Sequence, residues 1–116
     1  MRLTSEIFVS ALIRRVFSAG GYAAVLRKGS SEAGAIFIRQ RTRLGAESLY
    51  APAPQSFFVE EGRADDRLFE LRVQADDMLQ IDGAIEREVR FDPDCWVVEL
   101  EVDEIGDLLP FARQDR

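Results

Sequence analysis

Residues 5–19 carry one broad apolar stripe at helical spacing, and this feature limits the folds open to the chain more than any other. Phe8, Leu12 and Val16 lie on the stripe, and polar side chains recur at four-residue intervals on a narrow opposite face. Ser5 is suited to cap the helix and Gly20-Gly21 to end it. A helix with so little polar surface must be buried on most sides, by a sheet of its own chain or by a second subunit.

Alternating and β-branched runs predict a sheet for much of the remaining chain. The expected strands cover residues 22–28, 34–42, 48–51, 57–59, 67–73 and 95–102, with an exposed loop at 60–66. The turn residues at 29–33 predict a β-hairpin between the first two strands. A second helix is expected from the cap at Asp76-Asp77 to about Phe91, although Gly83 lies inside it and weakens its helical propensity.

The resulting order is α-β-β-β-(β)-β-α-β, which predicts a single α+β domain over residues 1–116. The short connections between successive strands favour a mostly antiparallel sheet. Two amphipathic helices supply one layer, and we therefore expect both of them to pack on one face of that sheet. A chain of 116 residues leaves no room for a second core of ordinary size.

The chain contains no histidine and a single cysteine, Cys95. Histidine is the usual near-neutral base and the usual partner of a nucleophilic Ser or Cys, so the composition argues against catalysis of that kind. It also excludes Cys/His zinc sites and an intramolecular disulfide. We predict no catalytic residue, no metal ligand and no cofactor. The lack of a signal-peptide pattern and of an apolar run long enough for a membrane span favours a cytoplasmic location.

The charge is divided unevenly, with a net of +5 over residues 1–58 and −11 over residues 59–116. Three arginines in the basic half, Arg39, Arg41 and Arg43, alternate along a predicted strand and would project from one face about 6 to 7 Å apart. Such a row, with Arg27 and Lys28 at the other end of the expected hairpin, could bind the phosphates of a nucleic acid or another anion. The alternative, which we favour, is pairing with the acids of the last strand, Glu99, Glu101 and Asp103.

Several strings in the sequence carry a resemblance to known proteins. They are MRLTSEIFVSALIRR at residues 1–15, AGGYAAV at 19–25, GAIF at 34–37, LYAPAPQ at 49–55 and EREVRFDPD at 86–94. Together they resemble a small family of alphaproteobacterial proteins classified as a domain of unknown function. The resemblance spans nearly the whole chain. It implies a bacterial cytoplasmic protein and supplies no activity.

Three hypotheses for the unknown function remain open. The first is a non-catalytic interaction module that binds a protein partner or a second copy of itself, with Ile7, Ala11 and Phe17 of the first helix as its candidate surface. The second is a nucleic-acid-associated protein that uses the arginine row. The third is a histidine-free enzyme that uses carboxylates, with those at 65–66, 76–77 and 92–94 as the candidates, together with Mg²⁺. We favour the first, because no catalytic pattern accompanies the apolar helix.

Overall fold

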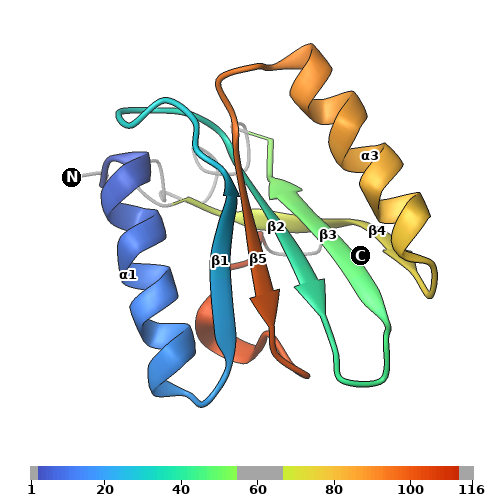
Figure 1. Ribbon diagram of the computed structural model, residues 1–116. Coiled ribbons are helices and arrows are strands. Elements are labelled where there is room, and N and C mark those ends of the chain that lie inside the picture. Colours follow the sequence, from blue (N-terminus) through green and yellow to red (C-terminus); the bar gives the residue numbers. More distant parts are fainter. Residues whose placement is uncertain (1–2, 55–66, 113–116) are drawn as a thin grey trace.

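The computed structural model describes residues 3–54 and 67–112 (Figure 1). The helices and strands are, in chain order, α1 (Ser5–Ser18), β1 (Tyr22–Arg27), β2 (Ile36–Arg41), β3 (Glu47–Pro52), β4 (Phe69–Ala75), α3 (Met78–Phe91), β5 (Trp96–Glu101) and the short 3₁₀ helix η1 (Gly106–Leu108). The α+β class and the order of these elements are confirmed. The strand predicted at 57–59 and the loop predicted at 60–66 lie outside the described residues.

The five strands form one mixed sheet in the order β1-β5-β2-β3-β4. Three of the four neighbouring pairs are antiparallel, as expected, and β2 pairs with β5 in parallel. The predicted hairpin between residues 22–28 and 34–42 is wrong, because β5 lies between β1 and β2. In this interior position, five of the six residues of β5, from Trp96 to Leu100, are buried. The turn residues at 29–33 predict that the chain turns there, but they do not show which strands pair with each other.

The two helices lie on opposite faces of the sheet, which corrects the expectation that both share one face. Val9, Leu12 and Val16 of α1 pack in one cluster with Ile38 of β2 and Val98 of β5. On the other face, α3 packs through residues such as Ile81 and Ala84 in a cluster with Phe37 and Leu49. A strand that sends alternate side chains to both faces needs a cover on each. The apolar stripes of α1 and α3 therefore pack into two separate cores, one on each face of the sheet.

The loop before β2 holds the first turn of α1. Thr4, rather than Ser5, is the N-cap and accepts a hydrogen bond from the backbone N–H of Ile7. Ser5 is the first helical residue, and its buried hydroxyl donates to the carbonyl of Gly34 over 2.6 Å. Asp77 caps α3 as expected, accepting from the N–H of Leu79. Both predicted helices thus form within one residue of their expected ends.

Candidate functional site

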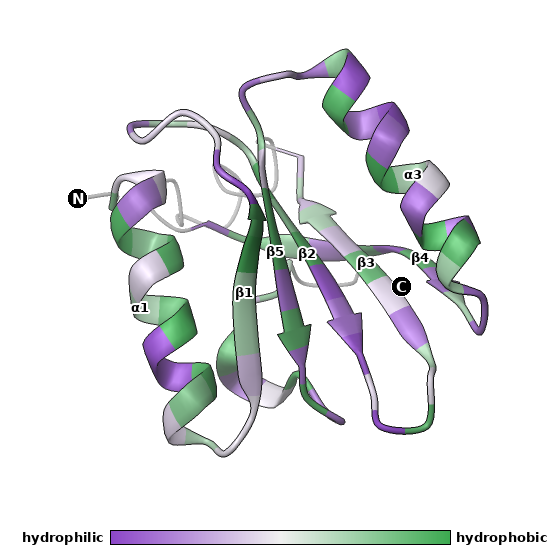
Figure 2. Ribbon diagram, viewed as in Figure 1, coloured by the Kyte–Doolittle hydropathy of each residue, from purple (hydrophilic) through white to green (hydrophobic). Residues whose placement is uncertain are grey.

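The hydropathy of β2 changes along its length, and this change defines the first part of the site (Figure 2). Ile36, Phe37 and Ile38 are buried in the two cores, whereas the last three residues of the strand are polar. Arg39 and Arg41 point to the same face as Phe37, which is the face that α3 covers in part. The strand therefore carries two guanidinium groups onto a surface beside α3.

Arg39 is the centre of an ion-pair network. Its side chain is buried, its Nε donates to Glu47 Oε1 over 2.8 Å, and its Nη1 donates to Asp82 Oδ1 over 2.6 Å. Although burial opposes the charged form, the two carboxylates outweigh it and raise the pKa of Arg39 above its ordinary value. One side chain thus links β2, β3 and α3. Arg39 therefore stays charged, and its guanidinium donates hydrogen bonds to two carboxylates.

Arg41 is paired with three acids. Its Nε lies 3.3 Å from Glu47 Oε2, and its Nη1 lies 3.1 Å from Glu99 Oε2 and 3.9 Å from Glu101 Oε2. The pairs join β2 to its neighbours on both sides, β3 and β5. The Arg41 guanidinium is therefore held by carboxylates from the strands on both sides of β2.

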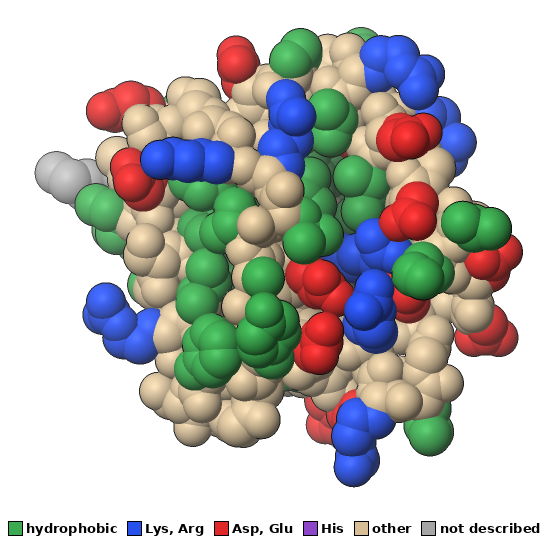
Figure 3. Space-filling model, in the orientation of Figure 1, with side chains coloured by type: hydrophobic (Ala, Val, Ile, Leu, Met, Phe, Trp, Pro, Cys, Tyr) green, Lys and Arg blue, Asp and Glu red, His purple; other side chains and the backbone are tan. Residues whose placement is uncertain are grey.

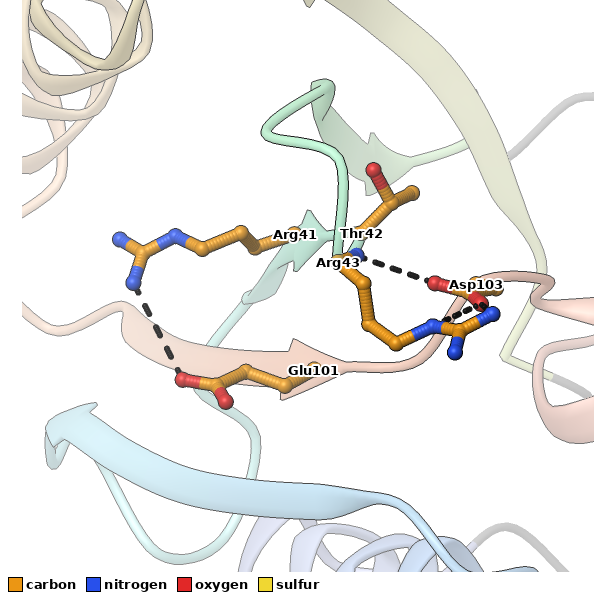
Figure 4. Close-up of a pocket in the computed structure, with 5 residues that line it drawn as sticks. All are labelled: Arg41, Thr42, Arg43, Glu101 and Asp103. Carbon is orange, nitrogen blue, oxygen red and sulfur yellow. Dashed lines mark hydrogen bonds and ion pairs between the residues drawn. The ribbon is translucent and has the colours of Figure 1, made fainter.

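Arg43 and Asp103 form an exposed pair beyond the end of the sheet (Figure 4). The backbone N–H of Arg43 donates to Asp103 Oδ1 over 3.0 Å and its Nε donates to Oδ2 over 2.7 Å. These two bonds hold the pKa of Asp103 below its ordinary value, with the backbone bond as the larger cause. A cavity of about 70 Å³ lies between Arg41, Arg43, Glu101 and Asp103. It is too small for a nucleotide.

The favoured interpretation of the arginine row is confirmed in its main point. Arg41 and Arg43 pair with the predicted acids Glu99, Glu101 and Asp103. Arg39 pairs instead with Glu47 and Asp82, which the sequence analysis did not single out. Glu47 could have been found, since it follows the turn at residue 45 and lies opposite Arg41 in the antiparallel pair. No sequence signal pointed to Asp82, because its position depends on the side of the sheet to which α3 returns.

The other two basic residues proposed for anion binding lie apart from this network. Arg27 donates from Nη2 to the carbonyl of Pro93 over 2.5 Å, at the end of β1 near the loop after α3. Lys28 follows it and is exposed. The structure therefore brings Arg39, Arg41 and Arg43 together among acids and leaves Arg27 and Lys28 outside that network. Anion binding by these five residues stays a prediction.

The second part of the site is the half of this face that α3 does not cover, over β1 and β5. Within it, Tyr22 and Leu26 are 49% and 50% exposed, and Phe17 at the end of α1 is 50% exposed. The ring of Phe17 meets that of Tyr22 edge to face, with the centroids 5.7 Å apart. We call Phe17, Tyr22 and Leu26 the apolar patch. Figure 3 shows hydrophobic side chains gathered on this face beside the acids and arginines of the network.

A groove of about 310 Å³ extends the apolar patch toward α3. Its apolar lining comes from β1, β5 and α3, namely Leu26, Val97, Ile85 and Val89. Its charged lining consists of Arg27, Arg39, Asp82 and Glu86. The groove therefore has both apolar and charged lining residues, which suits a side chain of another protein better than a single anion.

Of the three residues proposed on α1, only Phe17 joins the patch. Ile7 is 53% exposed but precedes Phe17 by ten residues, about 15 Å along the helix. Ala11 is half-buried. Tyr22 and Leu26 were not predicted as part of the surface, because residues 22–28 were expected to pair with residues 34–42 and the order of the strands could not be predicted. An edge strand leaves such side chains uncovered.

The remaining candidate chemistry gains no support in the described residues. Cys95 is fully buried, and burial raises the pKa of its thiol, so the thiolate is disfavoured. Within residues 3–54 and 67–112 no three Cys, Asp or Glu side chains are grouped so that they could hold a metal ion. No helix in this part of the chain is long and apolar enough to cross a membrane.

The fold and site together define a small α+β domain in which an internally paired arginine–carboxylate network lies beside an edge strand with exposed apolar side chains. Residues 3–110 match the family model described as "Protein of unknown function (DUF1491)". The chain belongs to the DUF1491 family.

Solved structures agree with this assignment over the whole chain. The solution structure of protein Atu0922 from A. tumefaciens is 58% identical, covers 100% of this chain and 99% of its own, and has a TM-score of 0.85. A crystal structure of a DUF1491 family protein from Caulobacter crescentus CB15 is 32% identical, covers 98% of this chain and 100% of its own, and has a TM-score of 0.77. An NMR structure of a DUF1491 family protein from the same organism has a TM-score of 0.78 at 32% identity, with 99% of each chain covered. No curated protein matches the chain.

Proposed function

We propose that this protein is a non-catalytic interaction module of the bacterial cytoplasm that binds a protein through its apolar patch and the adjoining groove. The observation that carries the proposal is the uncovered half of the sheet face. Phe17 and Tyr22 are each about half exposed and their rings are in contact, and Leu26, equally exposed four residues further along β1, lines the groove. Single exposed apolar residues are ordinary on protein surfaces, whereas several of them beside a groove are typical of a binding site.

The energetics favour a protein ligand at this place. Covering the exposed half of one large apolar side chain contributes about 1 kcal/mol, so three such side chains supply a useful part of a binding free energy. The mixed charges of the groove, Arg27 and Glu86 among them, can add specificity through complementary pairs. Aromatic side chains and arginines are enriched in such interfaces.

The nucleic-acid hypothesis receives less support. Phosphates bound at the arginine row would have to displace carboxylates from Arg39, Arg41 and Arg43, and the two acids that hold Arg39 reach it over 2.8 and 2.6 Å. Glu99, Glu101 and Asp103 would also lie beside the incoming phosphates and repel them. The same acids that satisfy the arginines therefore lower their affinity for an anion. For the carboxylate enzyme, the described residues contain no group of three Cys, Asp or Glu side chains that could hold Mg²⁺.

Affinity purification from the native cytoplasm tests the proposal, with each sample divided and half treated with nuclease. The bait is compared with Leu26→Glu, which places a charge in the apolar patch, and with Leu44→Glu as a matched control. Leu44 is 98% exposed in the turn between β2 and β3, away from the patch. We expect one partner, or a second copy of the chain, to survive nuclease and to be lost only with Leu26→Glu. Recovery that depends on nucleic acid would favour the arginine row instead.

A further inference from the structure

The two edges of the sheet differ in how they are protected. The edge strand β4 carries Glu70 and Arg72 in its middle, and residues of the C-terminal segment cover one end of it. The N–H of Phe69 donates to the carbonyl of Pro110, and the N–H of Ala112 donates to the carbonyl of Phe69. Charges and a covering segment are the usual devices that keep an edge strand from pairing with another chain.

The other edge strand, β1, has no covering segment and no charge in its middle among the described residues. A bulge near its end, between Val25 and Arg27, is its one irregularity. Its sequence, Tyr-Ala-Ala-Val-Leu-Arg, is charged only at the last position, and Tyr22, Val25 and Leu26 are 42% to 50% exposed. Within residues 3–54 and 67–112, the backbone of β1 hydrogen-bonds to β5 on one side and to no segment on the other. An open, apolar edge of this kind can accept a further strand.

The sequence of β1 is complementary to itself in one antiparallel register. A two-fold axis perpendicular to the sheet keeps each face of the sheet on its own side, so paired residues must share a face and their numbers must sum to an even value. When Ala24 lies on the axis, Ala23 of each copy faces Val25 of the other, and Tyr22 lies against Leu26 at the bulge, where the side chain of Leu26 lines the groove on the same face. The bulge between Val25 and Arg27 ends the regular pairing, so Arg27 lies outside it and no like charges meet. The two half-exposed side chains of the patch thereby cover each other.

We propose that β1 pairs antiparallel with β1 of a second copy of this chain about Ala24, so that the two sheets join into one. The pairing deepens the proposed function, on which it rests, by naming the partner as a second copy and the edge of β1 as the place of contact. An interface limited to a six-residue edge and the side chains around it is small. The dimer is therefore reversible and dissociates on dilution.

Sedimentation of the full chain over a concentration series tests the pairing, with two variants chosen for their neighbours. Tyr22→Lys places a cation opposite Glu101 of β5, and Leu26→Glu places an anion beside Arg27, so each new charge has a partner within its own subunit. Each alone puts a charge against an apolar side chain of the other copy. In a one-to-one mixture, Lys at 22 faces Glu at 26 across the interface, and the native Tyr–Leu pair remains on the other side of the axis.

The proposal expects a concentration-dependent dimer for the unaltered chain, a dissociation constant raised at least about tenfold for each variant alone, and recovery of the dimer in the mixture. Circular dichroism and thermal melts establish that both variants are folded, and Leu44→Glu is the control that leaves the dimer intact. A chain that stays monomeric up to about 1 mM overturns the pairing, as does a dimer that neither variant weakens. If the chain is monomeric but a different partner is still lost with Leu26→Glu, the proposed function stands and the self-pairing fails. If no partner is captured either, both fail.

Discussion

Arg39 donates from Nε to Oε1 of Glu47 over 2.8 Å, and both side chains are almost entirely buried, with 7% and 4% of their surface exposed. The pair lies on neighbouring strands, under α3, at the place where the apolar core of that face ends. Asp82 of α3 forms a second ion pair with Arg39. The network therefore marks the boundary between the half of this face that α3 covers and the half that it does not.

Removal of one partner of this pair should destabilise the protein strongly. We expect Arg39→Ala to lower the free energy of unfolding by about 3 to 5 kcal/mol, because it leaves Glu47 buried with Arg41 as its remaining cation. Urea denaturation measures the change. The exposed pair gives the control, since Arg43→Ala removes a guanidinium that is 89% exposed and should produce no resolvable change.

Replacement of both partners should cost much less than replacement of one. We expect the double variant Arg39→Met, Glu47→Leu to regain most of the stability that Arg39→Ala loses, because apolar side chains of similar size avoid the desolvation of two buried charges. The same denaturation series measures it. A double variant as unstable as the single one would mean that the network, rather than the burial of an unpaired charge, holds α3 in place.

The carboxyl group of Asp103 should titrate below its ordinary pH range. Its pKa is lowered by the backbone N–H and the side chain of Arg43. A carboxyl whose pKa is lower in the folded state adds stability above its unfolded pKa, and this contribution is lost as the pH falls through the folded pKa. Carbon-13 NMR of the side chain measures the midpoint. We expect Arg43→Ala to raise it only part of the way, because the backbone N–H of residue 43 remains. If the pKa of Asp103 returned fully to its ordinary value in this variant, the backbone hydrogen bond could not be the larger cause of the shift.

Two glycines should respond to alanine in opposite directions. Gly83 lies inside α3, and an added Cβ would have its nearest neighbour 3.8 Å away, so Gly83→Ala should stabilise the protein by up to about 1 kcal/mol. At Gly34 a Cβ would lie 2.6 Å from the carbonyl of Asp94, and we expect Gly34→Ala to lower the melting temperature. Thermal unfolding of both variants checks the pair. A gain at Gly34 would show that the loop before β2 does not pack against residue 94.

Cys95 should behave as a structural side chain. It is fully buried among Phe37, Leu49 and Ala51, and burial raises the pKa of its thiol. We expect a thiol reagent to label it at least about 1,000-fold more slowly in the native protein than in urea, since labelling requires opening of the core. Rapid labelling of the folded protein would point to a reactive thiol and would reopen the enzyme hypothesis.

The local structure could be predicted from the sequence because it depends on local patterns. The stripe of α1, the cap at Asp77 and the acids of the last strand all appear where they were expected. The pairing of strands could not be predicted, since the insertion of β5 between β1 and β2 depends on contacts between residues about 70 positions apart. The apolar patch was missed for the same reason, because its exposure follows from the position of β1 at the edge.

Photo-crosslinking in living cells tests the central claim, that the uncovered half of the face is where this protein binds another chain. Tyr22 is replaced by p-benzoylphenylalanine, which keeps an aromatic ring at the patch, and Leu44 is replaced by the same residue as the control. We expect irradiation to give a discrete adduct from position 22 and none from position 44. An adduct of twice the protein's mass would identify a second copy, and one of another mass a different partner. Position 22 yielding no adduct, or both positions yielding the same one, would contradict the account.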